Sequence, residues 1–129
     1  MIRALVITHG DISTQLVNVV EMIMGPTEGL SAQTNVNKSA TELQNDVKAW
    51  LAEGEEGAGE IILIDDYGGS CASAAVIACG EMKNRTIIAG VNLAMLLGYV
   101  TWRDSEDHPE LVAKIINKGR EAIMLVGGR

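Results

Sequence analysis

The chain has 129 residues, 47% of them hydrophobic and 21% charged, which fits one folded domain with a single core. Its net charge of −7 argues against a nucleic-acid partner, because phosphate backbones attract basic surfaces. Its apolar stretches fall short of the ~20 residues that a membrane-spanning helix needs, and residues 1–8 are typical of a strand and not of a signal peptide. We therefore expect no nucleic acid and no membrane insertion.

Apolar runs typical of buried strands alternate along the chain with segments of helical periodicity. In chain order, the sequence predicts a strand over residues 2–7, a helix over 11–24, a strand over 30–36, a helix after Ser39, a loop over 53–60, a strand over 60–65, a helix over 70–82, a strand over 86–90, helices over 92–103 and 109–119, and a final strand over 122–126.

Local signals support several of these boundaries. Gly25 followed by Pro26 is a typical helix end, and Ser39 with Glu42 has the spacing of a capping box. Because strands and helices alternate at least four times, the sequence predicts an open, mostly parallel α/β sheet with helices on both faces. Residues 1–129 are expected to form one such domain.

Polar residues stand where three of the predicted strands end. The first strand ends at His9, the third at Asp65 and the fourth at Asn92. Ligands bind open α/β sheets at the carboxyl ends of their strands. We therefore expect these three strand ends to converge on one edge of the sheet.

His9 is the most informative of these residues. A neutral imidazole is a nucleophile near neutral pH, and a carboxylate on its second ring nitrogen would fix the tautomer and stabilise the cation formed on attack. Asp65 can supply that carboxylate. A lone histidine can also simply end a strand, but the combination with Asp65 and the Gly-Gly-Ser sequence at 68–70 favours a chemical role.

The Gly-Gly-Ser sequence precedes a predicted helix, and helix N-termini attract phosphoryl groups. Ser70 could cap that helix or donate a hydroxyl hydrogen bond, although the same sequence is also common in plain turns with an N-cap. Cys71 follows, where a helix N-terminus could lower its pKa, but a buried small residue is the favoured interpretation.

Other site types have little support in the sequence. Neither a Walker A sequence nor a Gly-x-Gly-x-x-Gly fingerprint occurs, which argues against a nucleotide site. His9 and His108 lack zinc-type spacing with the cysteines, so no metal is expected. Cys71 and Cys79 lie too far apart along one helix to bridge, and free thiols favour a cytoplasmic location.

Three segments together resemble the mannose/fructose/sorbose-type enzyme IIA family of the bacterial phosphoenolpyruvate:sugar phosphotransferase system. They are Val6–Gly10, Leu63–Ser70 and Ala89–Leu96. Their order and spacing agree with the family, and the resemblance extends over about residues 1–122.

The resemblance implies a function for the sites already described. In that family the first histidine accepts a phosphoryl group from the phosphocarrier HPr and passes it to a IIB component for sugar uptake, without a cofactor. It implies that His9 is the phosphorylated residue and Asp65 its carboxylate partner, with a phosphoryl pocket formed by Gly10, Gly69, Ser70 and Cys71.

The resemblance also implies a flavodoxin-like parallel sheet with an added antiparallel strand, in homodimers that often exchange this strand. The candidate segment here is Ala122–Val126. The chain ends soon after, at Arg129, so no fused IIB domain is expected.

The sequence departs from the family pattern at three positions. Cys71 and Ala94 stand where proline is common, and Asp66 adds a carboxylate that could raise the proton affinity of the site or point into solvent. Two alternatives remain at this point. The chain could be a regulatory phosphoprotein of an incomplete system without sugar transport, or a flavodoxin-like binding module without transfer activity.

Overall fold

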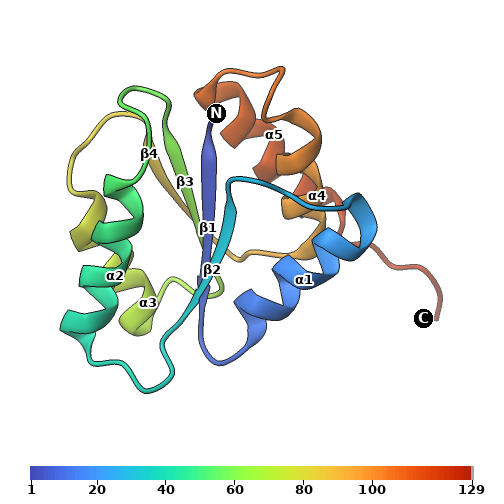
Figure 1. The fold of residues 1–129 in the computed structure, drawn as a ribbon. Helices are drawn as coiled ribbons and strands as arrows, with labels where there is room; N and C mark the ends of the chain where they lie inside the picture. Colours follow the sequence, from blue (N-terminus) through green and yellow to red (C-terminus); the bar gives the residue numbers. More distant parts are fainter. Residues whose placement is uncertain (129) are drawn as a thin grey trace.

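The computed structural model describes residues 1–128, so Arg129 of the predicted domain lies outside the described residues. Strands and helices alternate until two helices end the described fold (Figure 1). They are β1 (Arg3–Thr8), α1 (Ile12–Met24), β2 (Leu30–Thr34), α2 (Ala40–Ala52), β3 (Glu60–Ile64), α3 (Gly69–Cys79), β4 (Arg85–Ala89), α4 (Leu93–Trp102) and α5 (His108–Glu121). None of the helices within residues 1–128 has the length and apolar character needed to cross a membrane.

The four strands form one parallel sheet in the order β2-β1-β3-β4. Val6 of β1 lies opposite Ala32 of β2 on one side and Leu63 of β3 on the other. The chain leaves β1 for β2 at one edge and then crosses back to β3, so the order reverses between β1 and β3. The predicted α/β class is confirmed, and this reversal locates the place where such sheets bind ligands.

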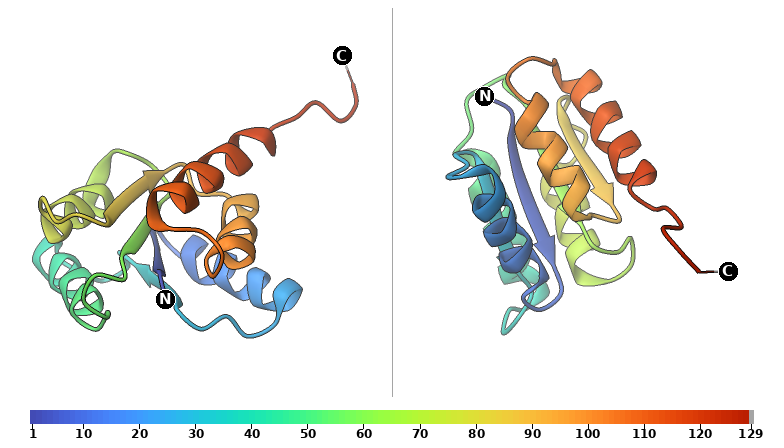
Figure 2. Two further views of the ribbon diagram at one scale, coloured as in Figure 1. Left: turned by 90° about the horizontal axis from the view of Figure 1, so that it is seen from above. Right: turned by 90° about the vertical axis from the view of Figure 1, so that its right-hand side faces the viewer.

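Helices cover both faces of the sheet (Figures 1 and 2). Helices α1, α4 and α5 pack on one face, and α2 and α3 pack on the other. Successive side chains of a strand point to opposite faces of the sheet. Ala4 and Val6 therefore pack in the core under α1, α4 and α5, while Leu5 and Ile7 pack in the core under α2 and α3. A strand buried on both faces needs the unbroken aliphatic run that β1 carries.

Several predicted boundaries are confirmed by local geometry. The Ser39 hydroxyl accepts a hydrogen bond from the Glu42 amide, and the Glu42 carboxylate accepts one from the Ser39 amide, which completes the capping box. Gly25 ends α1 with φ +85°. The second strand is two residues shorter than predicted, because the Thr34 hydroxyl accepts from the Val36 amide and turns the chain.

The structure does not show the predicted strand at the C-terminus. Residues 123–126 have no regular structure and extend away from the domain (Figure 2). These four residues are 82, 67, 81 and 92% exposed. A strand is stable only when its amides and carbonyls pair with a neighbour, and within residues 1–128 no strand pairs with this segment.

Candidate functional site

The site lies at the carboxyl edge of the sheet, where the strand order reverses. His9 follows β1 and Asp65 follows β3, and these two strands are neighbours in the sheet although the residues are 56 positions apart. Parallel pairing brings the two strand ends to the same level. The predicted convergence of His9 and Asp65 therefore follows directly from the topology.

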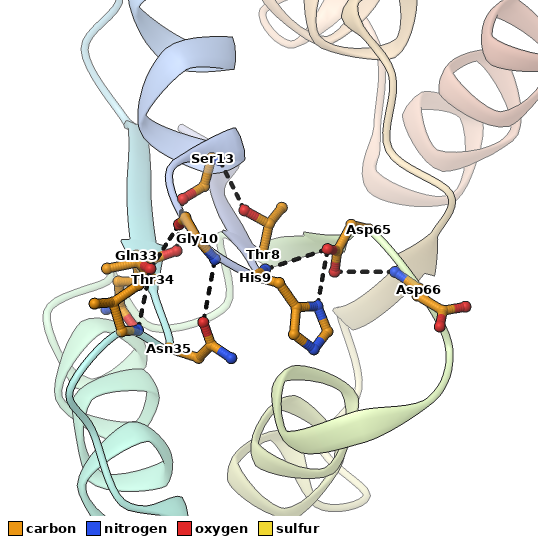
Figure 3. Close-up of polar contacts among 10 residues, drawn as sticks. Thr8, His9, Gly10, Ser13, Gln33, Thr34, Asn35, Asp65 and Asp66 are labelled. Carbon is orange, nitrogen blue, oxygen red and sulfur yellow. Dashed lines mark hydrogen bonds and ion pairs between the residues drawn. The ribbon is translucent and has the colours of Figure 1, made fainter.

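The carboxylate of Asp65 holds His9 through two contacts with the same oxygen (Figure 3). Nδ1 of the ring lies 2.9 Å from Oδ2, and the backbone amide of His9 donates to Oδ2 at 3.2 Å. The other oxygen, Oδ1, accepts from the amide of Asp66 at 3.0 Å. Both carboxylate oxygens of Asp65 are thus held by hydrogen bonds, and Oδ2 contacts Nδ1 of the His9 ring.

The two side chains differ in their access to solvent. The His9 side chain is 46% exposed and the Asp65 side chain 18%. Burial raises the pKa of Asp65, but the hydrogen bonds from the ring and the backbone of His9 outweigh it and hold the pKa below its ordinary value. Asp65 is therefore ionised near neutral pH and accepts the Nδ1 proton, which leaves the lone pair on Nε2 of His9.

Helix α3 begins beside the imidazole ring. Its N-cap is Gly68, and no side chain caps it. Ser70 lies in the first turn, so the predicted N-cap role of Ser70 is wrong, since the helix starts one residue earlier than expected. The first-turn amides of Gly69, Ser70 and Cys71 have no partner within the helix and are available to an anion.

Gly69 makes the close approach between helix and ring possible. Its φ is +88°, and a Cβ placed there would lie 3.2 Å from Nε2 of His9. Any other residue would be strained at this φ and would crowd the nitrogen that carries the lone pair. Gly69 thus lets the helix terminus lie close to the ring without crowding Nε2.

Cys71, in the first turn of α3, is fully buried. Burial raises the pKa of its thiol, and the nearby Asp65 carboxylate raises it further. The expectation that the helix N-terminus could lower this pKa is therefore wrong, while the interpretation as a buried small residue is confirmed. One ligand atom from each of His9, Asp65 and Cys71 lies within 4.8 Å of the other two.

Residues after β2 hold the loop that carries His9. The amide of Gly10 donates to Oδ1 of Asn35 at 3.2 Å, and the Thr34 hydroxyl donates to the carbonyl of Gly10 at 2.6 Å. Asn35 was not predicted as a site residue, because the predicted strand over residues 30–36 included it. Its position one residue after β2, at the edge shared with His9 (Figure 3), is the signal that finds it.

Other candidate residues are not part of this cluster. Asn92 caps α4 by accepting from the Met95 amide, and its amide group donates to the carbonyl of Gly119. The exposed Asp66 carboxylate points away from His9 (Figure 3), so of the two orientations considered for it the solvent-facing one is found. His108 lies against the carbonyl of Glu60, at the opposite end of β3.

Apolar side chains surround the site on the two nearest helices. A shallow hollow of about 440 Å³ is lined by residues of α3 and by Tyr67, whose side chain is 81% exposed. A second one of about 480 Å³ lies on α1, where Ile12 is half exposed. Chemically, the site offers one nucleophilic nitrogen, one ionised carboxylate and a set of amides suited to an anion.

A family model covers most of the chain. Residues 3–116 match the family described as "PTS system fructose IIA component", where PTS denotes the phosphotransferase system. The "PTS system mannose-specific EIIAB component" of Escherichia coli strain K12 is 34% identical over 118 residues, which are 90% of this chain and 36% of that protein. The chain thus spans about a third of the length of the curated relatives it matches.

Solved structures share the fold over nearly the full chain. The phosphotransferase system component EIIA of Streptococcus agalactiae has a TM-score of 0.88 at 22% identity and covers 97% of each chain. The mannose/sorbose-specific IIA subunit of Enterococcus faecalis has a TM-score of 0.85 at 22% identity, with 99% of this chain and 96% of that chain covered. With the match over residues 3–116, the chain belongs to the PTS IIA component family of the mannose and fructose type.

Proposed function

We propose that this chain is a single IIA domain that accepts a phosphoryl group on Nε2 of His9 from the phosphocarrier HPr and passes it to a IIB component in sugar uptake. Family membership supports a phosphotransfer role in a sugar phosphotransferase system. The observation that carries the residue assignment is the 2.9 Å contact between Nδ1 of His9 and the Asp65 carboxylate, which leaves Nε2 for attack.

The proposed step breaks the N–P bond of phospho-HPr and forms an N–P bond at His9. The Nε2 lone pair attacks phosphorus in line with the leaving nitrogen of HPr, and the Nδ1 proton stays on His9. The phosphorylated ring gains positive charge, which the ionised Asp65 offsets. Positioning and charge carry such transfers, so neither a metal nor an organic cofactor is required.

The proposed phosphoryl pocket is the gap between the ring and α3. The amides of Gly69, Ser70 and Cys71 and the positive end of the helix would hold the phosphoryl oxygens. The uncapped N-terminus of α3 and the absence of a side chain at Gly69 support this placement. The amide of Gly10 is already bonded to Asn35, so Gly10 would act by orienting the loop that carries His9.

A phosphorylation assay tests the proposal. The chain is incubated with enzyme I, HPr and phosphoenolpyruvate, and acid-labile phosphate on the protein is measured. We expect labelling of the wild type and none of His9→Gln, because that variant lacks the nucleophile. His108→Gln is the matched control and should be labelled like the wild type, because His108 lies at the far end of the sheet. Labelling that survives in His9→Gln would refute the assignment.

The proposed acceptor is tested by adding a purified IIB component to the phosphorylated chain. Transport predicts that the label moves to IIB. The regulatory alternative predicts that the label stays on His9. It also predicts that the genome of the organism carries no IIB, IIC or IID genes beside this one. A binding module without transfer activity predicts no label at all.

The proposed site of action is the cytoplasm. The two cysteines are free, as expected in a reducing environment, and the proposed phosphoryl donor HPr would be found there.

We also propose a homodimer in which each chain adds residues 123–126 to the outer edge of the partner's β4. The four apolar side chains of this segment are largely exposed in the single chain, and the outer edge of β4 is unpaired within residues 1–128. Pairing residues 123–126 with that edge would bury the apolar side chains and give the unpaired backbone groups of β4 hydrogen-bond partners. Sedimentation analysis should give a dimer, and a chain ending at Ala122 should be a monomer; an unchanged dimer after truncation would refute the exchange.

A further inference from the structure

The three side chains that meet at the switch point form the one group of three or more metal-ligating residues within residues 1–128. The histidine and cysteine spacing in the sequence gives no indication of it, since His9 and Cys71 come from different strand ends. We propose that His9, Asp65 and Cys71 bind a zinc ion, and that the bound ion prevents His9 from accepting a phosphoryl group. The second half of this inference rests on the proposed function.

The distances suit a small tetrahedral ion. Zinc binds nitrogen, oxygen and sulfur ligands at about 2.0–2.3 Å, so neighbouring ligand atoms of a tetrahedral site lie about 3.4–3.6 Å apart. The ligand atoms of His9, Asp65 and Cys71 already lie within 4.8 Å of one another. Closing around an ion therefore requires the widest pair of ligand atoms to approach by about 1 Å.

The ligand set selects the kind of metal. A thiolate and an imidazole are poor ligands for the hard ions Mg²⁺ and Ca²⁺, which prefer oxygen. Zinc accepts all three ligand types and has no redox chemistry that would consume the thiol. Three protein ligands leave a fourth position for water, which the exposed side of His9 makes accessible.

The electrostatics of the cluster change when a divalent cation enters. Cys71 is fully buried, and its sulfur lies within 4.8 Å of a carboxylate oxygen of Asp65. A zinc ion between the two groups neutralises the carboxylate and stabilises the thiolate. The thiol proton is released to solvent as the sulfur–metal bond forms.

Metal binding removes the nucleophile. An imidazole that gives one nitrogen to a metal keeps its proton on the other nitrogen, so neither retains a free lone pair. If the ion binds Nδ1, it also displaces the ring from its 2.9 Å contact with Asp65. Zinc and the phosphoryl group would therefore compete for His9.

Zinc binding is measured on the purified chain by competition with a chromophoric chelator. We expect one site in the wild type and, in Cys71→Ala, an affinity lower by about 100-fold or more, because even the loss of a group that merely supports a ligand costs 10–100-fold. Cys79→Ala is the matched control, as this second buried cysteine of α3 lies outside the cluster. Equal affinity in all three proteins, or no stoichiometric site, overturns the proposal.

Cobalt supplies a readout that a folding defect cannot imitate. Co²⁺ bound to a thiolate absorbs in the near ultraviolet, so this band should be present in the wild type and in Cys79→Ala. It should be absent from Cys71→Ser, which keeps the size of the side chain, while circular dichroism of that variant remains native. A band that persists in folded Cys71→Ser overturns the assignment of the ligand.

Competition is measured as transfer from purified phospho-HPr, so that zinc cannot act through enzyme I. Each rate with zinc is divided by the zinc-free rate of the same variant. The ratio should fall in the wild type and in Cys79→Ala and stay near one in Cys71→Ala; an equal fall in all three overturns the competition. Zinc binding without any phosphorylation of His9 would instead refute the proposed function and leave the metal site standing.

Discussion

Replacing Asp65 with asparagine tests the central contact of the site. The substitution keeps the shape of the side chain and removes the charge that accepts from Nδ1 and from the backbone amide of His9. A hydrogen bond to a charged group contributes about 1.5–3 kcal/mol. If the hydrogen bond to Asp65 acts only in the transition state, where the ring gains positive charge, its loss raises the barrier by that amount. The transfer rate of Asp65→Asn should then be about 10- to 150-fold lower than that of the wild type.

The rate is measured in single-turnover transfer from purified phospho-HPr, followed by quenched flow. Asp66→Asn is the matched control, since it removes the same charge from the adjacent residue, whose carboxylate faces solvent (Figure 3). We expect that variant to transfer within about twofold of the wild type, because charges exposed to solvent interact only weakly. Similar losses in both variants would show that net charge, and not the contact with His9, governs the rate. An unchanged rate in Asp65→Asn would refute the reasoning entirely.

Three further predictions follow from the same geometry. Gly69→Ala should abolish most transfer, because its Cβ would lie 3.2 Å from Nε2 of His9; Gly80→Ala, which also has a positive φ but no neighbour within 4 Å, should lose about 1 kcal/mol of unfolding free energy without losing transfer. Since the pKa of Asp65 is lower in the folded chain than its ordinary 3.8, the ionised carboxylate stabilises the fold above that pH and ceases to do so as the pH falls through the folded value. Urea unfolding of wild type and Asp65→Asn should therefore differ at pH 7 and converge in acid; a difference that grows in acid contradicts the assigned direction. Asn35→Ala should slow transfer with little change in the melting temperature, because it frees the Gly10 amide and loosens the loop that carries His9; thermal melts alongside single-turnover rates check this, and a transfer rate equal to that of the wild type would show that Asn35 does not position the loop.

Local sequence rules predicted the elements of the fold. Consecutive aliphatic residues identified β1 and β3 because strands of a parallel sheet are buried on both faces. Gly25 and the Ser39–Glu42 capping box fixed helix ends because each acts through neighbouring backbone groups. The larger misses are the end of β2 and both ends of α3. The end of β2 depends on a contact of Thr34, α3 begins after Gly68, and Gly80 with φ +57° ends it three residues earlier than predicted.

The residue types of the site were also evident in the sequence. His9 and Asp65 stood at the ends of strands, where a parallel sheet brings functional groups together. Asn35 was missed because the strand that precedes it was predicted two residues too long, which hid a residue at the functional edge. The final strand was predicted from its apolar residues, but a strand also needs a paired neighbour, and within residues 1–128 no strand pairs with this segment.

By itself, then, the sequence determined the α/β class and most element positions, and it singled out His9 as the candidate nucleophile, because these follow from local periodicity and from where polar residues interrupt it. The tertiary structure decided the strand order β2-β1-β3-β4, and with it the contact between residues 56 positions apart. It also decided that a Cβ on Gly69 would lie 3.2 Å from Nε2 of His9 and that Cys71 lies beside Asp65. Such contacts depend on which strand ends become neighbours, and that choice is made by packing across the whole sheet.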